Sequence, residues 1–303
     1  MLPDTHIHTA FSGDCTTPAR IQVERCLSLG MTELCITDHH DYATGMTEEI
    51  FLLDFSSYLS QLRSLQEEYS DRIRIGIGVE LGLQIHIQDY LEQLTRSLDV
   101  DYIIGSCHFI DQMDPYYPSF FQGRTERAAY ERFFEVSLKC IQTLSCFDSF
   151  GHLDYVVRYG PATNKNYSYL AYQDYIDPIL KTLIEKGIAL ECNTAGFKYG
   201  LSHPNPTEDI LRRYRQLGGE SITLGSDAHT PEYIGHAFDR TKAILIDCGI
   251  VIKHIDFWQP MAFPHFKVIW VVGWRDLYAP CPKLFVHIVV RNNRNFPPYQ
   301  RQN

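Results

Sequence analysis

Short runs of apolar residues recur along most of the chain, and each is followed by enough residues for a helix. Apolar runs of this length, spaced in this way, are typical of βα units that build a parallel sheet. Seven runs are predicted as strands: Leu2–Ile7, Glu33–Thr37, Ile73–Val79, Asp101–Cys107, Phe147–Gly151, Ile188–Cys192 and Ser221–Gly225. The pattern therefore predicts an α/β protein in which strands and helices alternate.

The segments between the runs carry helical spacing and helix boundary signals. Thr17 and Pro18 offer an N-cap followed by proline at the first helical position, and Gly30 ends that segment. Five further helices are predicted: Glu48–Glu68, Thr125–Leu144, Tyr172–Lys186, Thr207–Leu217 and Glu232–Cys248.

No internal repeat, low-complexity tract or flexible linker divides the chain, which favours one domain. A length of 303 residues is enough for a single large α/β barrel. We assign residues 1–256 to this domain and leave residues 257–303 as an atypical, unassigned tail. In the tail the βα rhythm stops and basic residues outnumber the single acid, Asp276, although Phe285–Val290 could form one more strand.

Charge and composition mainly exclude classes of partner. The formal net charge of −10 argues against general binding to the nucleic-acid backbone, so no nucleic-acid partner is expected. A small anionic substrate remains compatible, because bound metal ions can reverse the local field. No apolar stretch of about 18 residues predicts a membrane span, so no membrane partner is expected. The sequence does not indicate an oligomeric state.

The cysteines and the N-terminus predict the compartment. Nine cysteines are scattered along the chain without CxxC spacing, which is typical of reduced thiols rather than of a disulfide framework. The N-terminus has neither the basic region nor the apolar region of a signal peptide. The expected location is the cytoplasm.

Side chains of the metal-ligand type stand at the ends of all the predicted strands. They are His6 and His8, Asp38 and His39, Glu80, His108, His152, Glu191 and Asn193, and Asp227 and His229. In a (β/α) barrel the C-terminal strand ends meet at one mouth, so these residues would face one another. Imidazole nitrogens with carboxylate oxygens suit Zn, Mn or Fe(II), and Glu80 could bridge two ions.

The spacing of these residues adds to the argument. His6 and His8 share one face of a strand, because side chains alternate with period two, and Asp227 and His229 do the same. A lone pair of this kind is weak evidence, but ligand-type residues at seven strand ends are hard to attribute to chance. Asp14 follows the first strand by a short loop and is either another ligand or an ordinary turn residue.

The other histidines are not assigned to the site. His40 follows His39 directly and would point the other way, which favours a supporting role behind the ligands. Structural or surface roles are expected for the rest: His86, His203, His236, His254, His265 and His287.

With these residues assembled, the chain resembles the PHP (polymerase and histidinol phosphatase) family, and specifically its monofunctional histidinol-phosphate phosphatases, from about residue 3 to residue 250. The segments at 111–123 and 191–196 resemble this branch rather than the polymerase branch. The tail departs from the short, regular segment with which family members usually end. The motifs that carry the resemblance are Asp4-Thr5-His6-Ile7-His8, Ser12-Gly13-Asp14, Ile36-Thr37-Asp38-His39, Gly78-Val79-Glu80, Gly105-Ser106-Cys107-His108-Phe109, Gly151-His152-Leu153-Asp154 and Gly225-Ser226-Asp227-Ala228-His229.

The resemblance implies a fold and a ligand set. The fold would be a distorted, TIM-like (β/α)7 barrel that binds two to three divalent ions of Zn, Mn or Fe at the C-terminal strand ends. One ion would be held by His6, His8, Glu80 and Asp227, a second by Glu80, His108 and His152, and a third by Asp14, His39 and His229.

The resemblance also implies an activity, the hydrolysis of L-histidinol phosphate to L-histidinol and phosphate in histidine biosynthesis. The ions would bind the phosphate oxygens and make hydroxide available at neutral pH. Asp38 and His229 are the candidates for the acid that protonates the leaving alkoxide. Arg158 and Lys198 are the candidates for further phosphate contacts, unless they are solvated surface charges.

Three other functions compete with this hypothesis. Amidohydrolase barrels also begin with His-x-His, but there a strand-end lysine typically bridges the metals, and here Glu80 would have that role. A PHP-family phosphoesterase acting on another phosphate ester or on a nucleic-acid diester would use the same metals. A non-catalytic metal-binding barrel is the third alternative.

Overall fold

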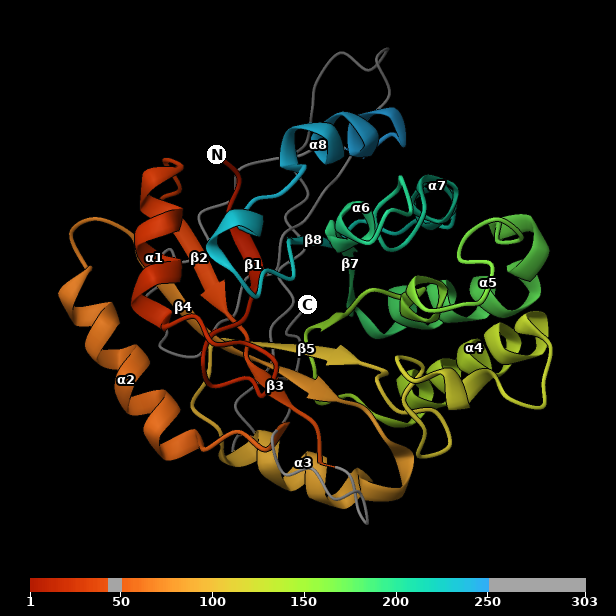
Figure 1. Ribbon diagram of the computed structural model, residues 1–303, viewed down its shortest axis with the longest axis horizontal. Coiled ribbons are helices and arrows are strands. Elements are labelled where there is room, and N and C mark those ends of the chain that lie inside the picture. Colours follow the sequence, from red (N-terminus) through yellow and green to blue (C-terminus); the bar gives the residue numbers. More distant parts are fainter. Residues whose placement is uncertain (43–50, 251–303) are drawn as a thin grey trace, which may run out of the picture.

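A barrel of parallel strands forms the centre of the computed structural model, which describes residues 1–42 and 51–250 (Figure 1). The strands are neighbours in the order β1-β2-β4-β5-β6-β7-β8, and all the pairs are parallel. A short additional strand, β3 (His39–His40), pairs with β4. The bounds are β1 Asp4–Ile7, β2 Glu33–Ile36, β4 Arg74–Gly82, β5 Tyr102–Ser106, β6 Ser149–Phe150, β7 Ala189–Asn193 and β8 Ile222–Gly225.

The last strand returns to the first, so the sheet is nearly closed. The Thr5 hydroxyl donates to the Leu224 carbonyl over 3.0 Å. Beyond the end of β8, the amide of Asp227 donates to the His6 carbonyl over 2.9 Å, and the amide of His8 donates to the Ala228 carbonyl over 3.0 Å. These contacts confirm the predicted barrel of seven strands.

Helices surround the barrel (Figure 1). The large apolar side chains that they bury join one core with the outward-facing residues of the strands. This arrangement leaves the ends of the strands open to solvent, where a site can form. The helices are α1 Ala19–Ser28, α2 Phe55–Glu68, α3 Gln88–Ser97, α4 Glu126–Thr143, α5 Tyr169–Lys186, α6 Ala195–Lys198, α7 Glu208–Gln216 and α8 Phe238–Asp247.

Local sequence explains several helix boundaries. The Thr125 hydroxyl accepts from the Ala128 amide at the start of α4, and the Ser168 hydroxyl accepts from the Ala171 amide at the start of α5. Gly187 ends α5 in the left-handed conformation, with φ of 65°, which glycine adopts without steric cost.

Some predicted boundaries were wrong. Thr17 does not cap α1, because its hydroxyl donates to the His229 carbonyl over 3.1 Å. The helix predicted from Glu232 begins only at Phe238, since Gly235 and Ala237 take the left-handed conformation. The helices α3 and α6 were not predicted, and α2 begins at Phe55, where the Asp54 carboxylate accepts from the amides of the first turn.

Several predictions concern residues outside the described ranges. These are the domain boundary at 256, the tail 257–303 with its candidate strand Phe285–Val290, the first residues of the helix predicted from Glu48, and His254, His265 and His287. Within the described ranges no helix has both the length and the hydrophobicity needed to cross a membrane. The cysteines described there are all buried free thiols, as expected.

Candidate metal centre and active site

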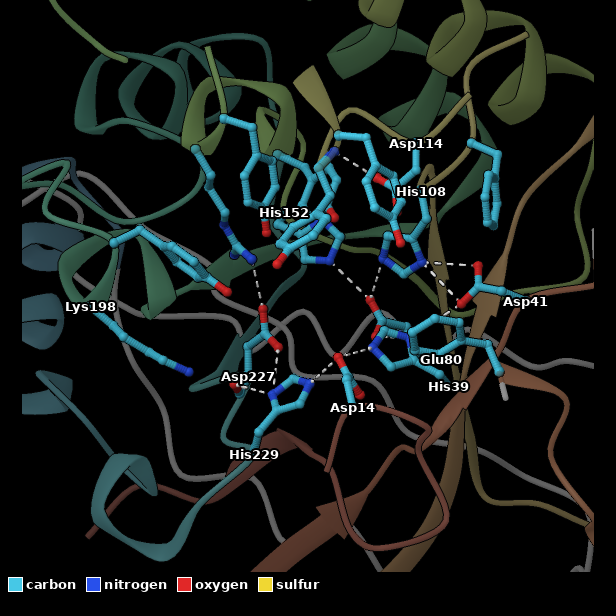
Figure 2. A pocket seen from close by; sticks show the side chains of 18 residues that line it. Asp14, His39, Asp41, Glu80, His108, Asp114, His152, Lys198, Asp227 and His229 are labelled. Carbon is cyan, nitrogen blue, oxygen red and sulfur yellow. Dashed lines mark hydrogen bonds and ion pairs between the residues drawn. The ribbon is translucent and has the colours of Figure 1, made fainter. Parts of the chain in front are cut away.

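The C-terminal ends of the strands surround a cavity of about 450 Å³. Figure 2 shows imidazoles and carboxylates from many strands converging on it. Predicted metal ligands line the cavity, namely Asp14, His39, Glu80, His108, His152, Asp227 and His229. His6 and His8 are completely buried and stand within 3.5 Å of the Glu80 carboxylate. The barrel thus brings together all nine residues of the predicted set.

Glu80 lies at the centre of the cluster, where β4 extends past its neighbours. Its Oε1 atom lies 2.9 Å from Nε2 of His152 and 3.2 Å from Nε2 of His108. Its Oε2 atom lies 3.1 Å from Nε2 of His6 and 3.1 Å from Nδ1 of His39. The two oxygens therefore face different imidazoles, as a carboxylate that bridges two cations would.

His6 of β1 and His8, the residue after β1, are each held through the Nδ1 atom. The Nδ1 atom of His6 lies 2.6 Å from Oε1 of Glu191, which aims the opposite ring nitrogen at Glu80. The Nδ1 atom of His8 lies 3.1 Å from the Ser12 hydroxyl, and its Nε2 atom is 3.4 Å from Oδ1 of Asp227. Contacts of this kind fix the tautomer and the orientation of a metal-binding imidazole.

Asp14 joins the more exposed side of the cluster (Figure 2). Its Oδ2 atom lies 3.0 Å from Nε2 of His229 and 3.7 Å from Nε2 of His39. The ring of His8 stacks against both imidazoles, with centroid distances of 4.1 Å to His229 and 4.4 Å to His39. The short loop after β1 therefore presents Asp14 to the site as a candidate ligand.

Unpartnered buried atoms test whether metal ions fit this site. Nε2 of His6, Nε2 of His8, Nδ1 of His39 and Oε2 of Glu80 are buried and make no hydrogen bond, although the nitrogens of His6 and His39 lie 3.1 Å from that oxygen. A buried polar atom without a hydrogen bond is costly, and divalent cations bound among these atoms would satisfy them. The chemistry of these donors, imidazole nitrogen and carboxylate oxygen, suits such an ion.

Three groups of side chains have ligand atoms close enough to share an ion. The first group, His6 with His8 and Glu80, agrees with the first predicted ion. His39 appears in both other groups, once with Glu80 and His108 and once with His8 and His229. The geometry therefore supports divalent metal binding by the predicted set, while the assignment of His39 to the third ion stays a prediction.

The ionisable side chains of the site shift one another's pKa values. Burial would raise the pKa of Glu80, but the imidazoles of His6, His39 and His108 hold it well below its usual value. Burial, together with the neighbouring His229 and His39, lowers the pKa of His8 to about 3. Glu80 is therefore ionised and His8 neutral, the forms in which both side chains bind metal ions.

Asp38 is not available as the acid that was predicted. Its carboxylate accepts from the amide and the hydroxyl of Thr9 and from the amide and the hydroxyl of Ser12. It is fully buried and does not line the cavity. It therefore stabilises the loop after β1.

Arg158 and Lys198 both line the cavity, but in different ways. The guanidinium of Arg158 is 2% exposed and donates to Asp227, Asn193 and Asn205 over 2.9 to 3.0 Å. Further N–H donors of this group remain for a ligand. The Lys198 ammonium lies at the rim, 4.6 Å from the centre of the Tyr233 ring and apart from the histidines (Figure 2). Neither side chain is a freely solvated surface charge.

The described histidines outside the set, His40 among them, make contacts away from the cavity. The Nε2 atom of His40 lies 2.7 Å from the Tyr90 hydroxyl, and its Nδ1 atom accepts from the Leu53 amide. His86 is exposed, His236 is half-buried, and His203 is buried against the Pro204 carbonyl. None of these four lines the cavity.

Two carboxylates support the histidines of the site; the sequence analysis missed Asp41, and it named Glu191 at a strand end without giving it a role. Asp41 lies 3.0 Å from Nδ1 of His108 and 3.3 Å from Nδ1 of His39. Glu191 contacts His6 and accepts from the His152 amide. Asp41 follows His39 by two positions, so period-two alternation at the strand end could have found it.

The rest of the cavity lining, called here the aromatic wall, was also missed. It contains Asp114 and an aromatic group made of Phe51, Phe109, Tyr116, Tyr117, Tyr155, Tyr159 and Tyr199. These residues come from loops after several strands, and the sequence carries no periodic signal for them.

A barrel with imidazoles and carboxylates gathered at its C-terminal mouth defines the class of metal-dependent barrel hydrolases. The sequence model of the PHP domain matches residues 4–195, and the chain belongs to this family. Its relatives identify the branch. Histidinol-phosphatase of Lactococcus lactis is 34% identical over 251 residues, which are 81% of this chain and 91% of that protein. Histidinol-phosphatase of Bacillus subtilis is 22% identical over 78% of this chain and 96% of that protein.

Solved structures agree with this assignment. Histidinol phosphate phosphatase of Lactococcus lactis, crystallised with zinc, L-histidinol and phosphate, superposes with a TM-score of 0.76 at 32% identity. The match covers 82% of this chain and 93% of that one. A structure from Listeria monocytogenes, 19% identical over 79% of this chain and 99% of its own length, has the same fold with a TM-score of 0.70.

Proposed function

We propose that this chain is a histidinol-phosphatase, a metal-dependent phosphomonoesterase that hydrolyses L-histidinol phosphate to L-histidinol and phosphate. One observation carries the proposal. A relative with the same barrel and 32% identity was crystallised with zinc, L-histidinol and phosphate, the metal and the two products of this reaction. The predicted ligand set of this chain converges at the C-terminal mouth of its barrel.

Each residue of the predicted metal set would have a role in binding the ions. Glu80 would bridge two ions, with His6, His8 and Asp227 on one side and His108 and His152 on the other. Asp14, His39 and His229 would hold a third. Zn, Mn and Fe(II) all suit such ligands. When bound, these ions neutralise phosphate oxygens and lower the pKa of water enough to supply hydroxide at neutral pH.

The two roles predicted for His229 exclude each other at one atom, because a nitrogen that binds a cation cannot carry a proton. The Nε2 atom faces Asp14 over 3.0 Å, and the ring is grouped with His8 and His39 around one potential ion. This geometry favours the ligand role over the role of a proton donor to the leaving alkoxide.

Cationic side chains would place the phosphate. The buried guanidinium of Arg158 is fixed by Asp227, Asn193 and Asn205, so it can donate to a phosphate oxygen without losing further side-chain entropy. Lys198 would contribute a second positive charge from the rim of the cavity.

The aromatic wall of the cavity would receive the histidinol part of the substrate. Tyr116, Tyr117 and Tyr159 offer aromatic faces to an imidazole ring. The Asp114 carboxylate is fixed by the Tyr116 amide, which donates to its Oδ1 atom over 2.7 Å. It would accept a hydrogen bond from the ammonium or the imidazole N–H of histidinol.

The test is a comparison of substrates. The purified chain is loaded with Mn²⁺ or Zn²⁺, and phosphate release is measured from histidinol phosphate, from a nucleotide monophosphate and, after treatment with a second phosphatase, from a diester. The proposal expects the highest kcat/KM for histidinol phosphate. A preference for the diester would favour a nuclease, and metal binding without any turnover would favour a non-catalytic barrel.

A further inference from the structure

Asp4 belongs to the first strand motif but not to the predicted metal set, and its carboxylate accepts hydrogen bonds from three residues. The side chain is completely buried at the start of β1. Its Oδ1 atom accepts from the Ser226 amide over 2.9 Å and from the His6 amide over 3.3 Å. Its Oδ2 atom accepts from the Ser226 hydroxyl and from the Gly235 amide, the latter over 3.0 Å.

These contacts hold both ends of the segment that carries two predicted ligands. Ser226 immediately precedes Asp227, and Gly235 lies six residues beyond His229. Asp227 itself has a φ of 55°, a left-handed conformation that residues other than glycine rarely adopt. A backbone of this kind persists only when the surrounding structure fixes it, and two of the Asp4 hydrogen bonds go to Ser226, the residue immediately before Asp227.

Asp4 also links the Ser226–Gly235 segment to His6 of its own strand. It accepts from the amide of His6, whose carbonyl in turn accepts from the Asp227 amide over 2.9 Å. The barrel is closed here by few main-chain bonds between β1 and β8, so the relative position of the two strand ends depends on such side-chain links.

We propose that Asp4 is a positioning residue that sets Asp227 and His229 against His6 and His8, and thereby fixes the geometry of the metal site. The inference rests on the proposed metal site, to which Asp4 itself contributes no ligand atom. A carboxylate suits the position because every partner atom is a donor. The amide of asparagine would place an N–H group opposite another donor, where no hydrogen bond forms.

The experiment compares Asp4→Asn with Asp148→Asn as a matched control. Asp148 is another buried aspartate of the barrel, and its Oδ2 atom accepts from the Ile103 amide at the beginning of β5, away from the cavity. Zn²⁺ affinity is measured by competition with a chromophoric chelator, the melting temperature is measured without metal, and kcat and KM are measured at saturating metal. Ser226→Ala removes one donor to Asp4 and provides a milder variant.

Asp4→Asn should weaken Zn²⁺ affinity by about tenfold or more and lower kcat, in line with the usual effect of residues that support metal ligands. Asp148→Asn should lower the melting temperature but leave metal affinity unchanged. If Asp4→Asn does not fold, Ser226→Ala should still weaken Zn²⁺ affinity, and wild-type affinity in that variant would overturn the proposal. Wild-type affinity and kcat in a folded Asp4→Asn variant would also overturn it. A wild-type chain that binds no metal would instead contradict the proposed function itself.

Discussion

A single carboxylate, Glu80, connects most of the imidazoles of the site. Its two oxygens face His152 and His108 on one side and His6 and His39 on the other. The surrounding imidazoles hold its pKa well below the usual value despite complete burial. The residue is therefore charged in a place where only cations or protonated imidazoles can balance it.

Glu80→Gln should remove most of the activity together with bound metal. The substitution keeps the shape of the side chain but replaces an oxygen ligand with an N–H₂ group that repels a cation. We expect a loss of at least about a hundredfold in kcat/KM, with a lower metal content by elemental analysis. Full activity after this change would contradict the role of Glu80 as a metal ligand.

Asp114→Asn tests substrate recognition separately from metal binding. Asp114 is not in the predicted ligand set and its carboxylate is held by the Tyr116 amide, so metal content should stay at the wild-type value. The loss of a charge-assisted hydrogen bond should raise KM for histidinol phosphate by about tenfold. Hydrolysis of p-nitrophenyl phosphate, which lacks the ammonium and the imidazole, serves as the control and should not change. Equal effects on both substrates would contradict the recognition role.

At the scale of elements, the strands could be predicted from the sequence and the loops could not. The seven barrel strands were found because buried parallel strands are continuous apolar runs, and the polar residues at their ends, with Asp14 in the following loop, gave the predicted ligand set. Thr17 was predicted as a helix cap, but its hydroxyl donates to the carbonyl of His229, which is distant in the sequence. The local sequence carries no signal for such a contact. The aromatic wall arises in the same way, since its residues come from loops that only the closed barrel brings together.

Asp38 shows the limit of such reasoning within one motif. Its neighbour His39 faces the cavity, but the Asp38 side chain turns to the donors of Thr9 and Ser12. Position at a strand end predicted proximity to the site correctly. The direction of the side chain depended on the conformation of another loop.

The contact between α5 and α7 should contribute to stability in a pH-dependent way. Arg213 donates to Asp177 and holds the pKa of that carboxyl below its usual 3.8. Because the folded-state pKa is lowered, the contribution is present above about pH 4 and is lost as the pH falls below that value. Asp177→Asn should lower the melting temperature slightly at pH 7 and by less at pH 3. Asp99→Asn, at an exposed pair with Arg63, should have no effect, and an equal change in both variants would contradict the account.

At the scale of the whole molecule, the metal site should contribute to the stability of the barrel as well as to catalysis. Ligands from β1, β4 and the segment after β8 meet around atoms that have no hydrogen-bond partner. Cations bound at this point would join strands that are far apart in the sequence. Metal binding should therefore stabilise the fold and not only the active site.

Removal of metal by a chelator should lower the melting temperature, and added Zn²⁺ or Mn²⁺ should restore it. A free metal concentration a thousandfold above the dissociation constant corresponds to about 4 kcal/mol of stabilisation. Differential scanning calorimetry measures the shift, and Ca²⁺, which prefers an all-oxygen site, is the control ion. A melting temperature that does not respond to Zn²⁺ would contradict a structural contribution of the metal.

The most direct test of the central claim is a titration of metal-free protein with Zn²⁺ or Mn²⁺, in which bound metal per chain and phosphate release from histidinol phosphate are measured together. Metal-dependent hydrolysis at this site predicts no turnover without metal and turnover that rises with occupancy until the site is filled. Turnover that is unchanged in metal-free protein, or absent from fully loaded protein, would contradict it.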